Sequence, residues 1–137
     1  MTQEDKELLL VDLCSRLPYG VVVELDEKFG FNKGTRVLVK ELLDLYCVEG
    51  IKPYLRPMSD MTEEEKRELS AKYNWSIRGN DISIRYHSEG YWDDDTECPT
   101  NEYLKLFDWL NKHYFDYRRL IEKGLAIAVT EEKNPYK

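Results

Sequence analysis

The sequence predicts a single α+β domain in which a small antiparallel sheet packs with N- and C-terminal helices. Apolar residues recur at helical spacing near both ends of the chain, whereas β-branched and alternating runs lie between them. The chain has 137 residues, of which 42% are hydrophobic, which is enough for one core. We expect one domain over 1–137, with a β-rich part at 18–57, a mixed helix and hairpin part at 58–130, and a tail at 131–137.

The first element is predicted to be a helix. Thr2 and Asp5 resemble a capping pair at its start. The sequence LPYG then stops the helix and turns the chain. One apolar face comprises Leu10, Leu13, Cys14 and Leu17, widened by Leu8, Leu9 and Val11.

The segment that follows is predicted to form the sheet. VVVEL at 21–25 is short and β-branched, as in a strand, and DEKFGFNKG is typical of a hairpin connection. Residues 35–48 are ambiguous, because Val37 and Val39 favour a strand whereas KELLDL favours a helix. We predict two strands that turn near Asp44, with a curled half-barrel as an alternative form of this sheet.

IKPYLRPMSDM, residues 51–61, contains Pro53 and Pro57, which lack a backbone donor. We predict a connector without regular structure here, at the seam between the two parts. Flexible linkers are poor in apolar residues, so an ordered, partly buried anchor is favoured over an exposed spacer. The apolar residues of this segment are Ile51, Tyr54, Leu55, Met58 and Met61.

The second part begins with a predicted helix at TEEEKREL, where Thr62 and Glu65 form a capping box. Gly79 and Asn80 suit a tight hairpin turn. The strand after this turn has one buried face, with Ile82, Ile84 and Tyr86.

The clearest helical pattern starts near Thr100. Its apolar stripe comprises Tyr103, Leu106, Phe107, Leu110 and Tyr114. Asp116 is predicted to cap a further short helix that ends at Gly124. LAIAV is expected to add an edge strand, and TEEKNPYK to form a frayed tail.

The net charge of −7 argues against direct nucleic-acid binding, which needs a basic surface. No apolar run reaches the roughly 18 residues of a membrane helix, and the polar start does not resemble a secretory signal. The three cysteines are far apart in the sequence, which is typical of a reduced protein. We therefore expect a cytoplasmic location and no membrane association.

HSEGYWDDDTEC, residues 87–98, concentrates side chains that could bind a metal or move a proton. It fits neither a calcium loop nor a zinc site. We interpret it as a solvated acidic turn, and we predict no catalytic residue and no cofactor. The weak metal-ligand candidates are His87, Asp93, Asp95 and Glu97.

NKHYFDYRRLIEK collects cations among aromatic residues, a composition found at interaction surfaces. An alternative is that the aromatic rings belong to the core and the cations extend over it. The candidate surface joins this segment to YLRP. Its partner-binding candidates are Tyr54, Arg56, Tyr114, Arg118 and Arg119.

IKPYLRPMSDMTEEEK and WLNKHYFDYRRLIEKGLAI resemble small uncharacterised proteins carried by prophages and mobile elements of gut bacteria. The resemblance implies an accessory protein in a bacterial cytoplasm, with no assigned activity. We therefore expect a non-catalytic protein that binds an unknown protein partner. The alternatives are a small metal-dependent hydrolase or nuclease-like enzyme that uses residues 87–98, and an acidic inhibitor that mimics nucleic acid.

Overall fold

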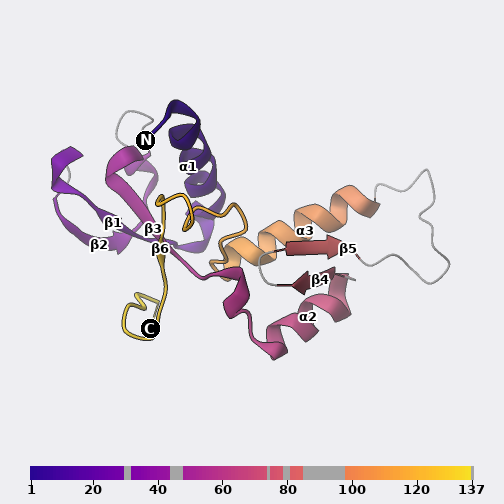
Figure 1. Cartoon of the computed structure of the whole chain (residues 1–137). Coiled ribbons are helices and arrows are strands. Elements are labelled where there is room, and N and C mark those ends of the chain that lie inside the picture. The colour runs from indigo at the N-terminus through magenta and orange to yellow at the C-terminus, as the bar shows by residue number, and fades with distance from the viewer. Residues whose placement is uncertain (30–31, 44–47, 74, 79–80, 85–97, 137) are drawn as a thin grey trace.

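The computed structural model describes residues 1–29, 32–43, 48–73, 75–78, 81–84 and 98–136, and the side chains of these residues outside 70–103. The predicted α+β class is confirmed, with a sheet-bearing half and a helical half side by side (Figure 1). The helices and longer strands are α1 (Gln3–Arg16), β1 (Val22–Leu25), β2 (Gly34–Val37), β3 (Ile51–Leu55), α2 (Glu63–Tyr73), β4 (Trp75–Arg78), β5 (Asp81–Ile84) and α3 (Cys98–Lys112).

The main sheet has the strand order β2-β1-β3-β6, in which β6 is the short strand Ile127–Ala128. β1 pairs antiparallel with β2 and β3, whereas β6 runs parallel to β3. The predicted edge strand at LAIAV is therefore present, but the sheet is mixed rather than wholly antiparallel. It is an open sheet whose outer strands are β2 and β6.

The prediction that residues 51–61 lack regular structure is wrong, because β3 is a central strand. Asp26 N donates to Gly50 O at 2.9 Å. Bonding alternates along an antiparallel ladder, so Pro53, which lies opposite Val23, turns its nitrogen away from β1. On the other side, β6 pairs only with Tyr54 and Leu55. The missing donor of Pro53 therefore removes no ladder bond.

Between β1 and β3, the described residues contain one strand of the two that we predicted for residues 35–48. β2 ends at Val37, and a short 3₁₀ turn, Lys40–Leu42, follows it. Asp44, where we predicted the turn, lies outside the described residues. The second strand of this region is β3, which begins only at Ile51.

α1 begins with the predicted cap, in which Thr2 Oγ1 accepts from Asp5 N and Asp5 Oδ2 accepts from Thr2 N. Its inward face, however, differs from the prediction. Cys14 and Val11 are exposed, because a buried ion pair shares the inward face with leucines. That face comprises Leu9, Asp12, Leu13 and Arg16.

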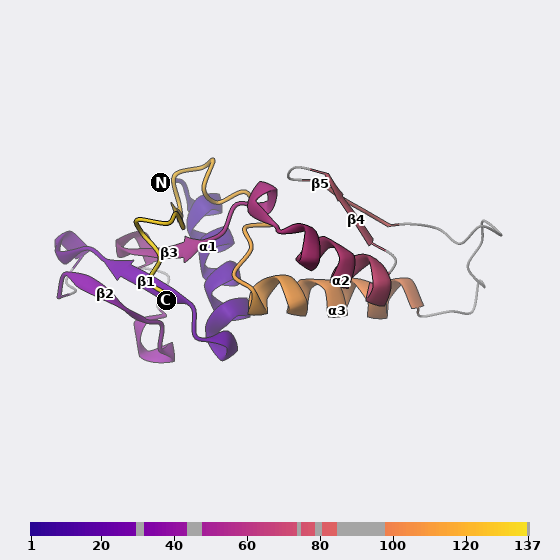
Figure 2. The same cartoon turned by 90° about the horizontal axis from the view of Figure 1, so that it is seen from below.

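The core of the sheet-bearing half lies between α1 and one face of the sheet. Figure 2 shows α1 between the sheet and the paired helices α2 and α3. Leu9 and Leu13 of α1 meet alternate residues of β1 and β3, and Leu120 and Leu125 close the cluster from the C-terminal segment. The sheet residues in this core include Val21, Val23, Leu25, Ile51 and Leu55.

The helical half has its own cluster. The predicted capping box of α2 is confirmed, with Glu65 N donating to Thr62 Oγ1 and Thr62 N to Glu65 Oε1. β4 and β5 form the predicted hairpin around residues 79–80. Tyr86 and the side chain of Tyr103, which we predicted to be buried, lie outside the described part of the structure. The buried residues are Met58, Met61, Leu69, Leu106, Trp109, Leu110 and Phe115, with Phe107 only partly buried.

The prediction of a short helix after Asp116 is wrong. The Asp116 carboxylate accepts from Leu120 N at 2.8 Å and from Ile121 N at 2.9 Å, so it caps a wide turn rather than a helix. Arg119 has a φ of 60° and Gly124 a φ of 74°, both in the left-handed region. A right-handed helix cannot pass through Arg119 in that conformation.

The end of the chain, predicted as a frayed tail, is held by Tyr136. The Tyr136 hydroxyl accepts from Val22 N at 3.1 Å and donates to Tyr54 O at 2.7 Å. These are the two backbone groups that would bond directly if the β1–β3 ladder continued by one pair. Burial raises the pKa of Tyr136, so the phenol keeps the proton that it donates.

Replacing Tyr136 with phenylalanine is expected to lower the free energy of unfolding by about 1–3 kcal/mol, because a part-buried donor and acceptor both lose their partner. Urea denaturation of the two proteins measures this difference. A loss below about 0.5 kcal/mol, the size of an ordinary surface substitution, would show that the hydroxyl bridge does not stabilise the ladder.

Candidate functional site

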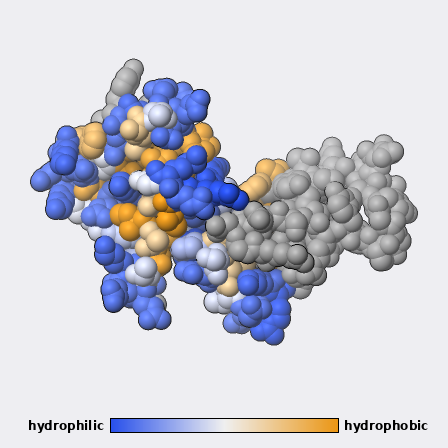
Figure 3. Space-filling model, viewed as in Figure 1, coloured by the Kyte–Doolittle hydropathy of each residue, from blue (hydrophilic) through white to orange (hydrophobic). Residues whose placement is uncertain are grey.

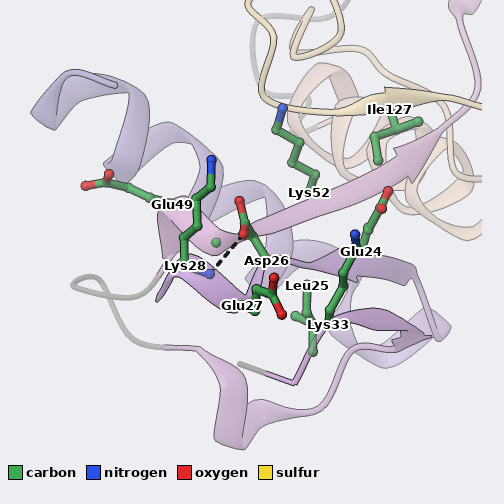
Figure 4. A pocket seen from close by; sticks show the side chains of 10 residues that line it. Glu24, Leu25, Asp26, Glu27, Lys28, Lys33, Glu49, Lys52 and Ile127 are labelled. Atoms are coloured by element: carbon green, nitrogen blue, oxygen red, sulfur yellow. Dashed lines mark hydrogen bonds between the residues drawn. The ribbon is translucent and has the colours of Figure 1, made fainter. Parts of the chain in front are cut away.

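One hollow lies at the end of the sheet, with a volume of about 410 Å³ (Figure 4). Its lining is mixed in charge, with four carboxylates and three amines, and these belong to Glu24, Asp26, Glu27, Glu49, Lys28, Lys33 and Lys52. Among the described residues, no group of histidine, cysteine and carboxylate side chains could hold a metal ion. The surface around the sheet-bearing half carries small apolar patches between hydrophilic residues (Figure 3).

A larger hollow, about 690 Å³, lies where the end of β3, the start of α2, the end of α3 and the C-terminal segment meet. We call it the interlobe cleft, and we take it as the candidate site because both halves of the chain form its walls. It is lined by Arg56, Asp60, Thr62, Lys112, His113, Tyr114, Val129, Thr130, Glu131, Asn134 and Tyr136.

Arg56 joins the walls of the cleft. Its guanidinium donates to both carboxylate oxygens of Glu65, at 2.7 and 2.9 Å, and lies 4.1 Å from the centre of the Phe115 ring. Its backbone N donates to Tyr114 O at 2.7 Å, and its carbonyl accepts from Asp116 N. A bidentate ion pair with a stacked ring holds a guanidinium in one orientation. Arg56 is therefore a fixed part of the cleft wall.

Glu65 and His113 form a titratable pair beside Arg56, with His113 Nδ1 4.0 Å from Glu65 Oε2. Burial alone would raise the pKa of Glu65, but the hydrogen bonds from Arg56 and Thr62 outweigh it and lower the pKa. For His113 burial is the largest effect and lowers the pKa, although the charges of Glu65 and Glu68 oppose it. At neutral pH the pair is therefore a carboxylate beside an uncharged imidazole.

Tyr114 occupies the rim of the cleft with a φ of 64°, a conformation that glycine adopts more cheaply. Its hydroxyl donates to Tyr19 O at 2.6 Å, and its ring stacks on Tyr136 with centroids 3.9 Å apart. These contacts explain why a tyrosine stands where the helix end favours glycine. They tie the 3₁₀ turn after α1, Leu17–Tyr19, and the C-terminal segment to the rim.

The structure brings two of the five predicted partner-binding residues into the cleft, Arg56 and Tyr114. Tyr54 is buried in the sheet, where its hydroxyl donates to Glu24 at 3.0 Å. Arg118 lies over the Tyr117 ring and 3.7 Å from Asp12 Oδ1, and Arg119 is exposed in a turn outside the cleft. Arg118 therefore fits the alternative interpretation, in which the cations extend over buried aromatic residues.

Three residues of the site were not predicted from the sequence. Asn134 and Tyr136 line the cleft, and Glu65 binds Arg56 beside it. Glu65 was assigned only to a helix cap, and residues 131–137 to a tail. The available signal was the NPY sequence, in which a turn-forming pair precedes a large aromatic residue. The metal candidates His87, Asp93, Asp95 and Glu97 lie outside the described residues, and so the metal interpretation stays a prediction.

The protein is expected to lose stability as the pH is lowered, because His113 takes up a proton more readily in the unfolded chain. Its folded pKa is lower than the ordinary 6.5, so the unfolded chain binds a proton at a higher pH than the folded protein does. The contribution is complete above pH 6.5 and is lost as the pH falls through the lowered pKa. Urea denaturation between about pH 7.5 and about pH 5 should show a smaller loss for His113→Gln than for the wild-type protein. Parallel curves for both would contradict this.

No protein-family model, curated protein or solved structure matches this chain in the comparisons. None of the helices in the part of the chain that the structure describes has the length and apolar character needed to cross a bilayer. The function must therefore be inferred from the geometry of the cleft itself.

Proposed function

We propose that the protein is a non-catalytic binding protein whose interlobe cleft receives a segment of a protein partner. The observation that carries this proposal is the fixed wall made by Arg56, Glu65 and Tyr114. The Arg56 guanidinium and the Glu65 carboxylate bond to each other, and the Tyr114 hydroxyl bonds to the Tyr19 carbonyl, so these groups form a shaped surface rather than an activated group. Rigid surfaces of this kind reduce the entropy lost on binding.

The rim offers groups for recognition beside that wall. Lys112, Asp60 and Glu131 are exposed at the cleft, and the stacked rings of Tyr114 and Tyr136 supply amphipathic area of the kind enriched at binding interfaces. The proposal includes the accessory role in a bacterial cytoplasm that the prophage resemblance implies. A metal-dependent enzyme that uses residues 87–98 and an inhibitor that mimics nucleic acid are the alternative functions.

Photo-crosslinking in the cells from which the chain comes tests the proposal. A photoreactive amino acid is placed at Lys112 in the cleft, and at Lys123, an exposed residue that does not line it, as the control. We expect a covalent adduct with one protein from position 112 and none from position 123, with the adduct identified by mass spectrometry. The absence of an adduct at 112, or equal adducts at both positions, would contradict the proposal.

A further inference from the structure

β2 is an outer strand of the sheet and lies at the end of the molecule opposite α2 and α3 (Figures 1 and 2). All four of its residues, Gly34–Val37, are exposed. The side chain of Val37 is 52% exposed, which is unusual for a valine within a sheet. An outer strand with exposed backbone is a template on which another extended chain can pair.

The register shows which backbone groups of β2 point outward. Leu38 N donates to Val21 O at 2.8 Å, so Val21 and Leu38 form a hydrogen-bonded pair. Bonding alternates along an antiparallel ladder, which makes Arg36 opposite Val23 a bonded pair as well. Thr35 and Val37 therefore direct their N–H and C=O groups away from β1. Among the described residues, none supplies a backbone partner to these groups.

Positions 33–41, which contain β2, carry more cations than carboxylates, although the whole chain carries −7. Of the carboxylates nearby on β1 and after it, Glu24 lies opposite Thr35 and accepts from the Tyr54 hydroxyl, and Asp26 and Glu27 line the same hollow as Lys33. Lys33, Arg36 and Lys40 are exposed, and none has an ion-pair partner among the described residues. Glu41 is the one carboxylate between positions 33 and 41. A second copy of the chain would bring the same cations together across an antiparallel pair, which is unfavourable. A carboxylate-bearing chain would meet complementary charge.

We propose that the outer edge of β2 binds an extended, acidic segment of another protein, which adds a fifth strand to the sheet. Main-chain bonds to Thr35 and Val37 hold the segment, and Lys33, Arg36 and Lys40 select its carboxylates. This surface is separate from the interlobe cleft. Failure of either proposal leaves the other standing.

The probe is a synthetic peptide of alternating valine and glutamate, and its binding is measured by fluorescence anisotropy at low salt. Val37→Pro removes an outward N–H without removing a bond to β1, and it is expected to weaken binding roughly tenfold or more. Val37→Ala shortens the same side chain but keeps the N–H, and it should bind the peptide nearly as well as the wild-type protein. Circular dichroism confirms that both variants fold.

Binding of the glutamate peptide that is lost in Val37→Pro and kept in Val37→Ala supports the proposal. No binding at millimolar peptide, equal binding by both variants, or equal binding of a valine–lysine peptide would overturn it. Analytical ultracentrifugation of the protein alone tests whether a second copy of the chain binds this edge instead. A dimer that Val37→Pro abolishes would assign the edge to a second copy, which also overturns the proposal.

Discussion

Replacing Asp12 with alanine is expected to lower the free energy of unfolding by about 3–5 kcal/mol, most of the margin of a small domain. Asp12 and Arg16 are both fully buried, and Arg16 Nε donates to Asp12 Oδ2 at 2.9 Å. Arg16 Nη2 also donates to Phe115 O, and Arg118 Nε lies 3.7 Å from Asp12 Oδ1. Removing the carboxylate leaves the Arg16 charge buried without its counterion.

The double variant Asp12→Leu with Arg16→Met is the control, because replacing both members of a buried pair by apolar residues removes the uncompensated charge. We expect it to recover a large part of the stability that Asp12→Ala loses. Urea denaturation of the three proteins gives the comparison. A loss below about 1 kcal/mol for Asp12→Ala would show that the pair behaves like a surface ion pair.

Leu110→Ala is expected to cost about 2–5 kcal/mol, because Leu110 is fully buried between α3 and its neighbours. Leu104 lies on the same helix and is 59% exposed, so Leu104→Ala removes the same atoms with little lost burial. Its cost should stay near the 0.5 kcal/mol that is usual for surface substitutions.

Thermal or urea denaturation of both leucine variants tests the packing of α3. Phe107, which the sequence pattern placed on the same stripe, is only partly buried, and Phe107→Ala should fall between the two. Equal costs for Leu110→Ala and Leu104→Ala would contradict the position of α3 in the core.

The elements that were predicted well have signals in neighbouring residues. Thr2 with Asp5 and Thr62 with Glu65 mark helix starts through side-chain bonds three residues apart. The two-residue gap at 79–80 marks the hairpin in the same local way. Local chemistry of this kind can be read without knowing the tertiary structure.

The elements that were predicted wrongly depend on distant parts of the chain. Pro53 fits a central strand only because its nitrogen faces the side where β6 pairs with later residues. Asp12 and Arg16 turn α1 because Arg118 and the Phe115 carbonyl complete their network. No pattern in adjacent residues shows these partners.

The candidate site could be predicted only in part for the same reason. Tyr114 was found from the mixture of cations and aromatic rings in NKHYFDYRRLIEK, and Arg56 from the YLRP segment that the predicted surface joins to it. Glu65, His113 and Tyr136 come from three separate segments, and only the folded chain brings them beside Arg56.

The interlobe cleft exists only if the two halves of the chain keep one fixed arrangement, and unfolding followed with two probes tests this most directly. Trp109, which is buried in the core of the helical half, gives the tryptophan signal for the second half after the tryptophans at 75 and 92 are changed to phenylalanine. A fluorophore on Cys14, which is exposed on α1, reports on the first half after Cys47 and Cys98 are changed to serine. We expect the two signals to give one coincident urea transition, as in a single cooperative unit. Separate midpoints for the tryptophan and Cys14 signals would show that the halves unfold independently and that no fixed cleft lies between them.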